Sequence, residues 1–178
     1  MTAPDSPGPA YWAFISYSSH DRAWARWLQR AIEAYVVPHR LIGHATPAGP
    51  APRRLRPLFS DRTELAADAD LAGKVHEALD RSAFLIVLCS PSATASRWVD
   101  EEIRYFRRAH GEGRILAAIV EGDPAAHQGF FPPALHYRDE AGELEGAEPI
   151  AADLRPGGDG RYLAKLKLVA GLLGVGLD

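Results

Sequence analysis

The stretch FLIVLCSPSATASRWVDEEIRYF, residues 84–106, combines an apolar run, a turn of small residues and the start of a helix. The apolar run, residues 84–89, is long enough for a buried strand and much too short for a membrane span. The turn extends from Ser90 to Ser96, and an amphipathic pattern follows it. This succession is typical of the carboxyl edge of a parallel sheet, where α/β proteins bind their ligands.

Three consecutive acidic residues in the helical part of this stretch differ in their expected surroundings. Asp100 and Glu101 point away from the apolar side of the helix, and Arg104 lies four and three positions ahead of them, so we expect both to be solvated. Glu102 lies at the edge of the apolar side, one turn after Trp98. A half-buried carboxylate is expected there, with a pKa raised by desolvation. This position fits either a helix acid at the margin of the core or a functional group.

The composition of the 178-residue chain excludes several functional classes. A net charge of −3 argues against a dedicated nucleic-acid binder. Cys89 is the only cysteine, so an internal disulfide and a cysteine metal site are both excluded, and the seven histidines show no ligand spacing. The chain has no signal-peptide pattern and no apolar run of membrane length. We therefore expect a cytoplasmic protein without a metal site.

The remaining elements are predicted from shorter patterns. Residues 1–10, with several prolines, are expected to form a flexible tail, and the aromatic run Tyr11–Tyr17 the first strand. Ser18 and Asp21 have the spacing of a capping box before a helix that Pro38 ends. Further strands are expected at residues 58–59, 114–120 and 149–152, helices at residues 71–79 and 162–173, and a loop with short helical turns at residues 122–147.

Strands that alternate with helices and are almost continuously apolar predict an α/β fold, with a parallel sheet covered on both faces. Right-handed crossovers bring every strand-to-helix turn to the same edge of the sheet. In the strand order 2-1-3-4-5, residues 16–19 lie beside residues 90–96 at the switch point. Glu102, one to two turns into the following helix, is then expected near a ligand crevice.

Three blocks in this order resemble a bacterial Toll/interleukin-1 receptor (TIR) domain: FISYSSHD (14–21), LFSDRTELAADADL (58–71) and LIVLCSPSATASRWVDEEI (85–103). The resemblance is strong over residues 11–120 and weak beyond them. It implies a flavodoxin-like five-stranded parallel sheet, with residues 60–70 as the BB loop. In NAD-cleaving members, a tryptophan precedes a glutamate by four residues at the head of the third helix, and Trp98 and Glu102 match this pattern.

The resemblance implies cleavage of the bond between nicotinamide and ribose, with NAD+ as substrate and no cofactor. Nicotinamide leaves as a neutral molecule, so no general acid is needed. A carboxylate close to the sugar can stabilise the oxocarbenium-like transition state, as one carboxylate does in glycosidases. We assign that catalytic role to Glu102, and we expect Trp98 to form an aromatic wall of the substrate pocket.

The resemblance also implies a substrate-binding role for residues in the first two blocks. Ser16, Tyr17 and Ser18 are expected to line the pocket. Some relatives carry an arginine at the position of Ser18, which puts any phosphate contact there in question. Asp61 and Arg62 open the BB loop and are expected either to order it by pairing or to contact substrate from a neighbouring subunit, because enzymatic TIR domains form sites between stacked protomers.

The product and even the functional class stay open at this point. Attack by water would give ADP-ribose, whereas attack by an adenine nitrogen or a ribose hydroxyl would give a cyclic isomer, which bacterial relatives use as an immune signal. TIR domains also act as non-enzymatic modules that signal by self-association. A third interpretation, a nucleoside deoxyribosyltransferase-like enzyme, shares the fold but fits the first two blocks poorly.

Residues 11–178 are interpreted as one TIR domain, an N-terminal effector that is weakly active until something clusters it. The expected partners are NAD+, other TIR domains and a regulatory or sensor domain on the C-terminal side, with no direct nucleic-acid or membrane partner. Cys89 could be a nucleophile, but its place inside an apolar run favours a core residue.

Overall fold

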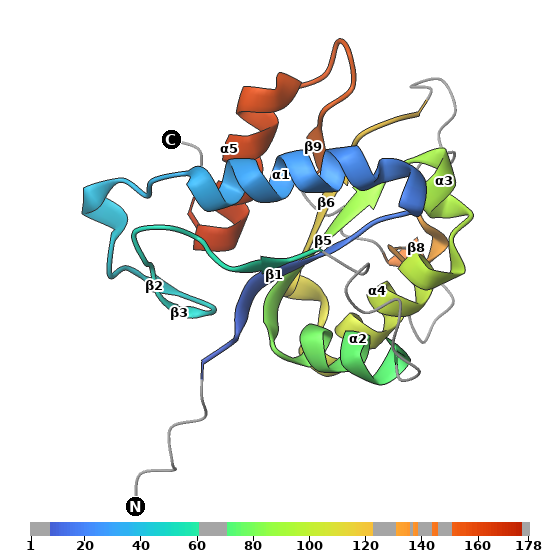
Figure 1. The fold of residues 1–178 in the computed structure, drawn as a ribbon, viewed down its shortest axis with the longest axis horizontal. Helices are drawn as coiled ribbons and strands as arrows, with labels where there is room; N and C mark the ends of the chain where they lie inside the picture. Colours follow the sequence, from blue (N-terminus) through green and yellow to red (C-terminus); the bar gives the residue numbers. More distant parts are fainter. Residues whose placement is uncertain are drawn as a thin grey trace, which may run out of the picture.

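The computed structural model describes residues 8–60, 71–122, 131–135, 137–138, 144–145 and 151–175. A five-stranded parallel sheet lies at its centre (Figure 1). The strands are β1 (Tyr11–Ser16), β4 (Leu58–Phe59), β5 (Ser82–Cys89), β6 (Ile115–Ile119) and β9 (Ala151–Asp153). They lie in the order β4-β1-β5-β6-β9, which is 2-1-3-4-5 when these five strands alone are counted along the chain. The predicted flavodoxin-like α/β architecture is confirmed.

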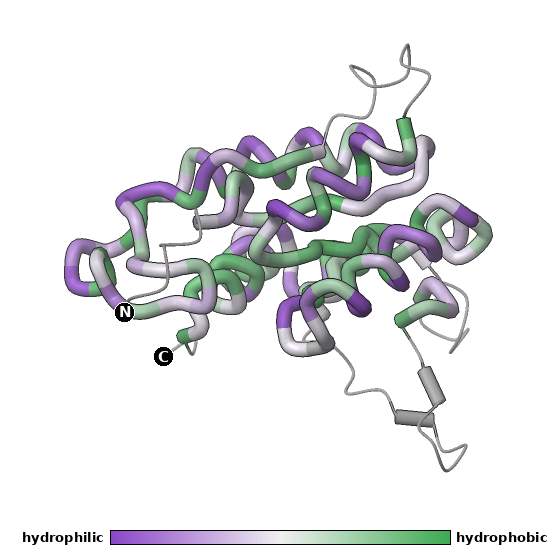
Figure 2. The backbone as a smooth tube through the Cα atoms, turned by 90° about the horizontal axis from the view of Figure 1, so that it is seen from below, coloured by the Kyte–Doolittle hydropathy of each residue, from purple (hydrophilic) through white to green (hydrophobic). Residues whose placement is uncertain are grey.

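Helices cover both faces of the sheet, as Figure 1 shows. Helix α1 (Arg22–Ala34) packs with α5 (Gly160–Leu173) on one face, and α2 (Leu71–Asp80) packs with α4 (Arg97–His110) on the other. The sheet therefore divides the hydrophobic core into two clusters, one under each pair of helices. Figure 2 shows hydrophobic segments in the middle of the molecule and hydrophilic segments mostly on the outer helices.

The strand residues alternate between these two clusters. In the register of β1 and β5, Phe14 pairs with Leu85 on the face of α2 and α4. Ile15 pairs with Ile86 on the face of α1 and α5. All eight residues of β5 are buried, which explains why it is apolar from Ala83 to Cys89. The side chains of successive residues at the end of a strand consequently point to opposite faces of the sheet.

Short elements join the main ones. Helix α3 (Pro91–Thr94) connects β5 to α4, and two antiparallel pairs are formed by β2 (Ala45–Thr46) with β3 (Gly49–Pro50) and by β7 (Tyr137–Arg138) with β8 (Leu144–Glu145). The 3-10 helices are η1 (Ser19–Asp21), η2 (His39–Leu41), η3 (Glu112–Arg114) and η4 (Pro133–Leu135). The prediction of a loop with short helical turns at residues 122–147 agrees with η4. It missed β7 and β8, because strands of two residues are too short to show alternation.

The predicted capping box before α1 is wrong. Ser18 Oγ accepts a hydrogen bond from the backbone N–H of His20 at 3.4 Å, and Asp21, at the N-cap of α1, makes no capping bond with its side chain. The reason is the intervening 3-10 turn, which delays the α-helix until Arg22 and turns the carboxylate of Asp21 elsewhere. Among the described residues, every helix falls short of the length and apolarity that a membrane crossing requires.

Candidate functional site

The carboxyl ends of β1 and β5 are neighbours at the switch point of the sheet. A hydrogen bond joins the segments that follow them, because Ser90 Oγ donates to Asp21 Oδ2 over 2.6 Å. Ser90 Oγ also accepts from the backbone N–H of Ala93 at 3.0 Å and so caps α3. This double contact brings the two polar turns together at one edge, as predicted.

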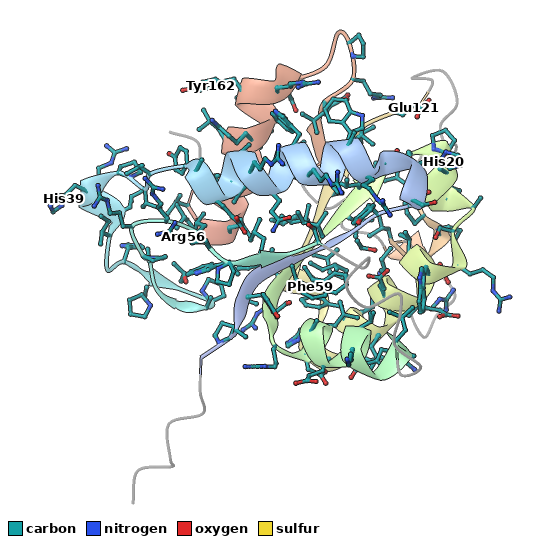
Figure 3. The ribbon with its side chains drawn as sticks, viewed as in Figure 1. His20, His39, Arg56, Phe59, Glu121 and Tyr162 are labelled. Atoms are coloured by element: carbon teal, nitrogen blue, oxygen red, sulfur yellow. The ribbon has the colours of Figure 1, made fainter. Side chains whose placement is uncertain are left out.

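The carboxylate of Asp21 is buried, with 2% of the residue exposed. Burial raises its pKa above the ordinary value of 3.8, the hydrogen bond from Ser90 opposes that change, and the negative charge of Glu121 adds to it. Figure 3 shows His20 and Glu121 at the end of the molecule where α1 begins. Asp21 therefore forms a buried polar link between the first and third strands of the sheet.

Helix α4 follows α3 and gives the three consecutive acids different surroundings. Ser96 caps it, since its Oγ accepts from the backbone N–H of Val99 at 3.3 Å. Asp100 accepts from Arg104 Nε at 2.8 Å, and Glu101 is exposed. Glu102 is 2% exposed, so it is more deeply buried than the half-buried position that its angle on the helix predicted.

The predicted site residues on the face of α2 and α4 are Trp98, Glu102 and Ser16. Trp98 is partly buried on the first turn of α4, and Glu102 lies one turn later. Ser16 pairs in register with Val87, a member of the core cluster under α2 and α4. It is completely buried, and its Oγ has no hydrogen-bond partner among the described residues. Ser16 and Glu102 thus face the same side of the sheet.

Tyr17 lies on the opposite face. It belongs to the core cluster under α1 and α5, where it lines a cavity of about 530 Å³ together with α1 and Ser60. Ser18, one residue later, is buried and caps η1. The structure therefore does not bring Ser16 and Tyr17 to one wall, because consecutive residues of an extended chain point to opposite faces.

Residues 13–152 match the family model described as "TIR domain", which covers most of the chain. This chain belongs to the TIR domain family. A relative named "NAD(+) hydrolase ApTIR", from an Actinoplanes species, is 36% identical over 115 residues. That match covers 64% of this chain but 14% of the relative, so the chain corresponds to a small part of the relative's length.

Among solved structures, the TIR domain is similar to the TIR domains of the activated Roq1 resistosome, which recognises the pathogen effector XopQ. The identity is 18% and the TM-score 0.44, and the match covers 64% of this chain and 59% of that one.

Two residues predicted for the TIR domain's site, Asp61 and Arg62, lie outside the described residues. Cys89 is completely buried at the end of β5, and burial raises the pKa of its thiol, which favours the core interpretation over a nucleophile. Within the described ranges, no three His, Cys, Asp or Glu side chains gather to hold a metal ion.

Two features of the TIR domain were not anticipated from its sequence. One is the buried bond between Asp21 and Ser90, which joins residues far apart in the chain. The other is the set of arginines on α1 that line the cavity beside Tyr17. The sequence did carry a signal for the second, because Arg22, Arg26 and Arg30 follow one another at intervals of four and so lie along one side of a helix.

Proposed function

We propose that this TIR domain cleaves the nicotinamide–ribose bond of NAD+. The observation that carries the proposal is the position of Glu102, a carboxylate 2% exposed near the start of α4, one turn after Trp98 and on the side of the sheet to which Ser16 points. Burying a carboxylate is costly, and its burial near the edge where parallel sheets generally bind ligands favours a chemical role. The similarity to a protein named as an NAD+ hydrolase supports the same activity.

The reaction needs a negatively charged group that the protein holds close to the ribose. As the bond to the neutral nicotinamide breaks, positive charge develops on the ribose, and the carboxylate of Glu102 stabilises it. This interaction is stronger in a site that excludes water, because the effective dielectric constant is lower there. Trp98 provides an aromatic surface against the nicotinamide ring or the sugar.

The ribosyl centre can be attacked by water, giving ADP-ribose, or from within the dinucleotide, giving a cyclic isomer. We propose that the domain forms one of these products and that self-assembly activates it. Asp61 and Arg62 would either order the BB loop by pairing or contact substrate from a neighbouring subunit. The biological setting we propose is bacterial antiphage immunity.

The direct test is to incubate concentrated protein with NAD+, with and without a crowding polymer that promotes assembly, and to resolve nicotinamide and the other products by chromatography. We expect Glu102→Gln to reduce nicotinamide release by at least about 100-fold, because it removes the negative charge while keeping the size of the side chain. Glu101→Gln is the matched control, since it removes the neighbouring exposed charge and should keep full activity. Cleavage that survives Glu102→Gln would contradict the assignment.

A second candidate is a TIR module that assembles without catalysis. The observation that favours it is the exposure of two large apolar side chains on α5, Tyr162 at 71% and Leu163 at 40%. Figure 3 shows Tyr162 projecting from this helix. Assembly of the wild-type protein without any release of nicotinamide would favour this function over NAD+ cleavage.

A further inference from the structure

The cavity of about 530 Å³ that Tyr17 lines is bordered by three arginines of α1: Arg22, Arg26 and Arg30. Its other walls come from Gln29 and Glu33 on the same helix and from Ser60, the residue directly after β4. It therefore lies between α1 and β4, which is the edge strand of the sheet. Arg26 and Arg30 also border a second hollow on the side of Trp27, so they form the ridge between the two.

The three arginines lie in a row along α1. They are four residues apart, so each is displaced from the next by about 6 Å along the helix axis. Like charges at this spacing repel one another, and a cation in the first turn also opposes the helix dipole. The described residues supply no ion pair or hydrogen bond for any of the three. On α4, by contrast, Arg104 is paired with Asp100 at 2.8 Å.

The one acid that lines the cavity serves another purpose. Glu33 Oε1 accepts from the backbone N–H of Leu58 at 2.9 Å and from Gln29 Nε2 at 3.2 Å. Gln29 Nε2 also donates to the carbonyl of Leu58 at 3.1 Å, and its Oε1 accepts from the hydroxyl of Ser60. This network holds β4 against α1. The lining thus carries three positive charges against one negative charge, in a protein whose net charge is −3.

The cavity reaches the carboxyl edge of the sheet. Tyr17 follows directly after β1, and Ser60 follows β4, so both lie where a parallel sheet binds ligands. Arg22 follows Asp21, the residue that bonds to Ser90 at the switch point. The chain at Ser16 and Tyr17 is what separates this cavity from the face that carries Glu102.

We infer that the arginine cavity, defined by Arg22, Arg26, Arg30, Tyr17 and Ser60, binds the diphosphate group of a nucleotide. The planar guanidinium group donates two parallel hydrogen bonds to a phosphate, and two arginines one turn apart can each hold one phosphate of a diphosphate. The bound anion would neutralise the repulsion along α1. The ligand is either the NAD+ substrate itself, crossing the edge of the sheet, or a separate nucleotide. The first case rests on the proposed function and the second does not.

The binding test uses inorganic pyrophosphate as the probe, titrated at low salt into the wild-type protein and followed by calorimetry and by the fluorescence of Trp24 and Trp27 on α1. We expect saturable binding that weakens as salt is added. The double variant Arg26→Ala and Arg30→Ala should bind at least about tenfold more weakly, because it loses two of the three guanidinium groups that can donate paired hydrogen bonds to phosphate. The matched control, Arg81→Ala with Arg108→Ala, removes the same charge from two exposed positions, one directly after α2 and one on α4, and should bind as wild type does.

A conservative variant shows whether weaker binding comes from lost hydrogen bonds or from misfolding. Arg26→Lys with Arg30→Lys keeps both charges but loses the bidentate geometry, so intermediate binding is expected. Absence of pyrophosphate binding by the wild type would overturn the inference, and so would equal binding by the alanine variant and its matched control.

Kinetics with NAD+ then distinguish the two sources of the diphosphate. If the substrate provides it, the double alanine variant should show a KM raised at least about tenfold with little change in kcat, because uniform binding is lost. An unchanged KM together with lost pyrophosphate binding identifies a separate nucleotide. A wild-type protein that binds pyrophosphate but never cleaves NAD+ would refute the proposed function and leave the binding site standing.

Discussion

Asp21 and Glu102 are the two carboxylic acids that the described part of the fold buries. Asp21 receives a hydroxyl hydrogen bond from Ser90, which ties β1 and α1 to β5 and α3. Glu102 lies on the buried side of α4 beside Ile103 and one turn before Phe106. A buried acid needs either a structural partner or a chemical use. We interpret Asp21 as a structural link, and the chemical role proposed for Glu102 depends on its burial one turn after Trp98, near the start of α4.

Replacing Asp21 by asparagine tests the first interpretation. Burial raises the pKa of Asp21, so the folded state binds its proton more tightly than the unfolded state does. Its contribution to the free energy of unfolding is consequently greatest below about pH 3.8 and declines as the pH rises through the raised folded value. We expect the stability of Asp21→Asn relative to wild type to increase between about pH 4 and pH 7, as measured by urea denaturation.

The control for this measurement is Asp100→Asn, which alters a surface ion pair and should not reproduce that trend. A stability difference between Asp21→Asn and wild type that does not change with pH would count against a buried, proton-binding Asp21.

At the residue scale, the sequence separated the three acids of α4 correctly, because the angle of each position on a helix is a local property. The sequence pattern underestimated the burial of Glu102, because the exposed fraction of a helix residue depends on which other segments pack over the helix. The bond between Asp21 and Ser90 could not be predicted at all, since no local pattern links residues that far apart.

Among the elements, the segment from β9 to α5 is held by a network of charged residues. Asp159 Oδ2 accepts from the backbone N–H of Asp153 at 2.8 Å, and its Oδ1 pairs with Lys167 at 2.7 Å. Asp153 in turn pairs with Arg155 at 2.8 Å. The hydrogen bond from Lys167 lowers the pKa of Asp159, and the hydrogen bond from Arg155 lowers that of Asp153. Both carboxylates therefore stabilise the fold in their charged form.

We predict that Asp159→Asn lowers the free energy of unfolding by roughly 1 kcal/mol at pH 7, because it removes the charge that pairs with Lys167. A lowered folded pKa provides stability above the ordinary value of 3.8 that is lost as the pH falls through the folded value. The difference between variant and wild type should shrink below about pH 3.8, as urea denaturation across pH 7 to 3 can measure. A difference that persists unchanged at the acid end would rule out the ionic contribution.

The longer elements were predictable because each contains enough residues to show a periodic or continuous apolar pattern. The unbroken apolar run of β5 and the helical spacing in α1 both lie where the sequence pattern put them. β7 and β8 were missed because each has two residues, and the pairing of two such strands depends on contacts between them rather than on local preference.

At the scale of the whole molecule, the two core clusters share one sheet, so we expect them to unfold together. Phe106, completely buried on α4, tests this. Phe106→Ala should lower the free energy of unfolding by about 3–5 kcal/mol, because it leaves a cavity in the core. Tryptophan fluorescence, with Trp24 and Trp27 on α1 and Trp98 on α4, should report the same shift as far-UV circular dichroism. Glu101→Ala, an exposed change on the same helix, should leave the transition within about 0.5 kcal/mol of wild type.

The sequence by itself determined the strand and helix order, the parallel α/β class and the distinct character of Glu102, because hydrophobic period and turn residues are local properties of the chain. Only the tertiary structure decided which side chains share a wall. It put Ser16 on the face of α4 and Tyr17 on the face of α1, joined Asp21 to Ser90, and set the arginines of α1 around a cavity beside β4. These relations depend on which helix covers which face of the sheet, and that is settled by packing between segments distant in the chain.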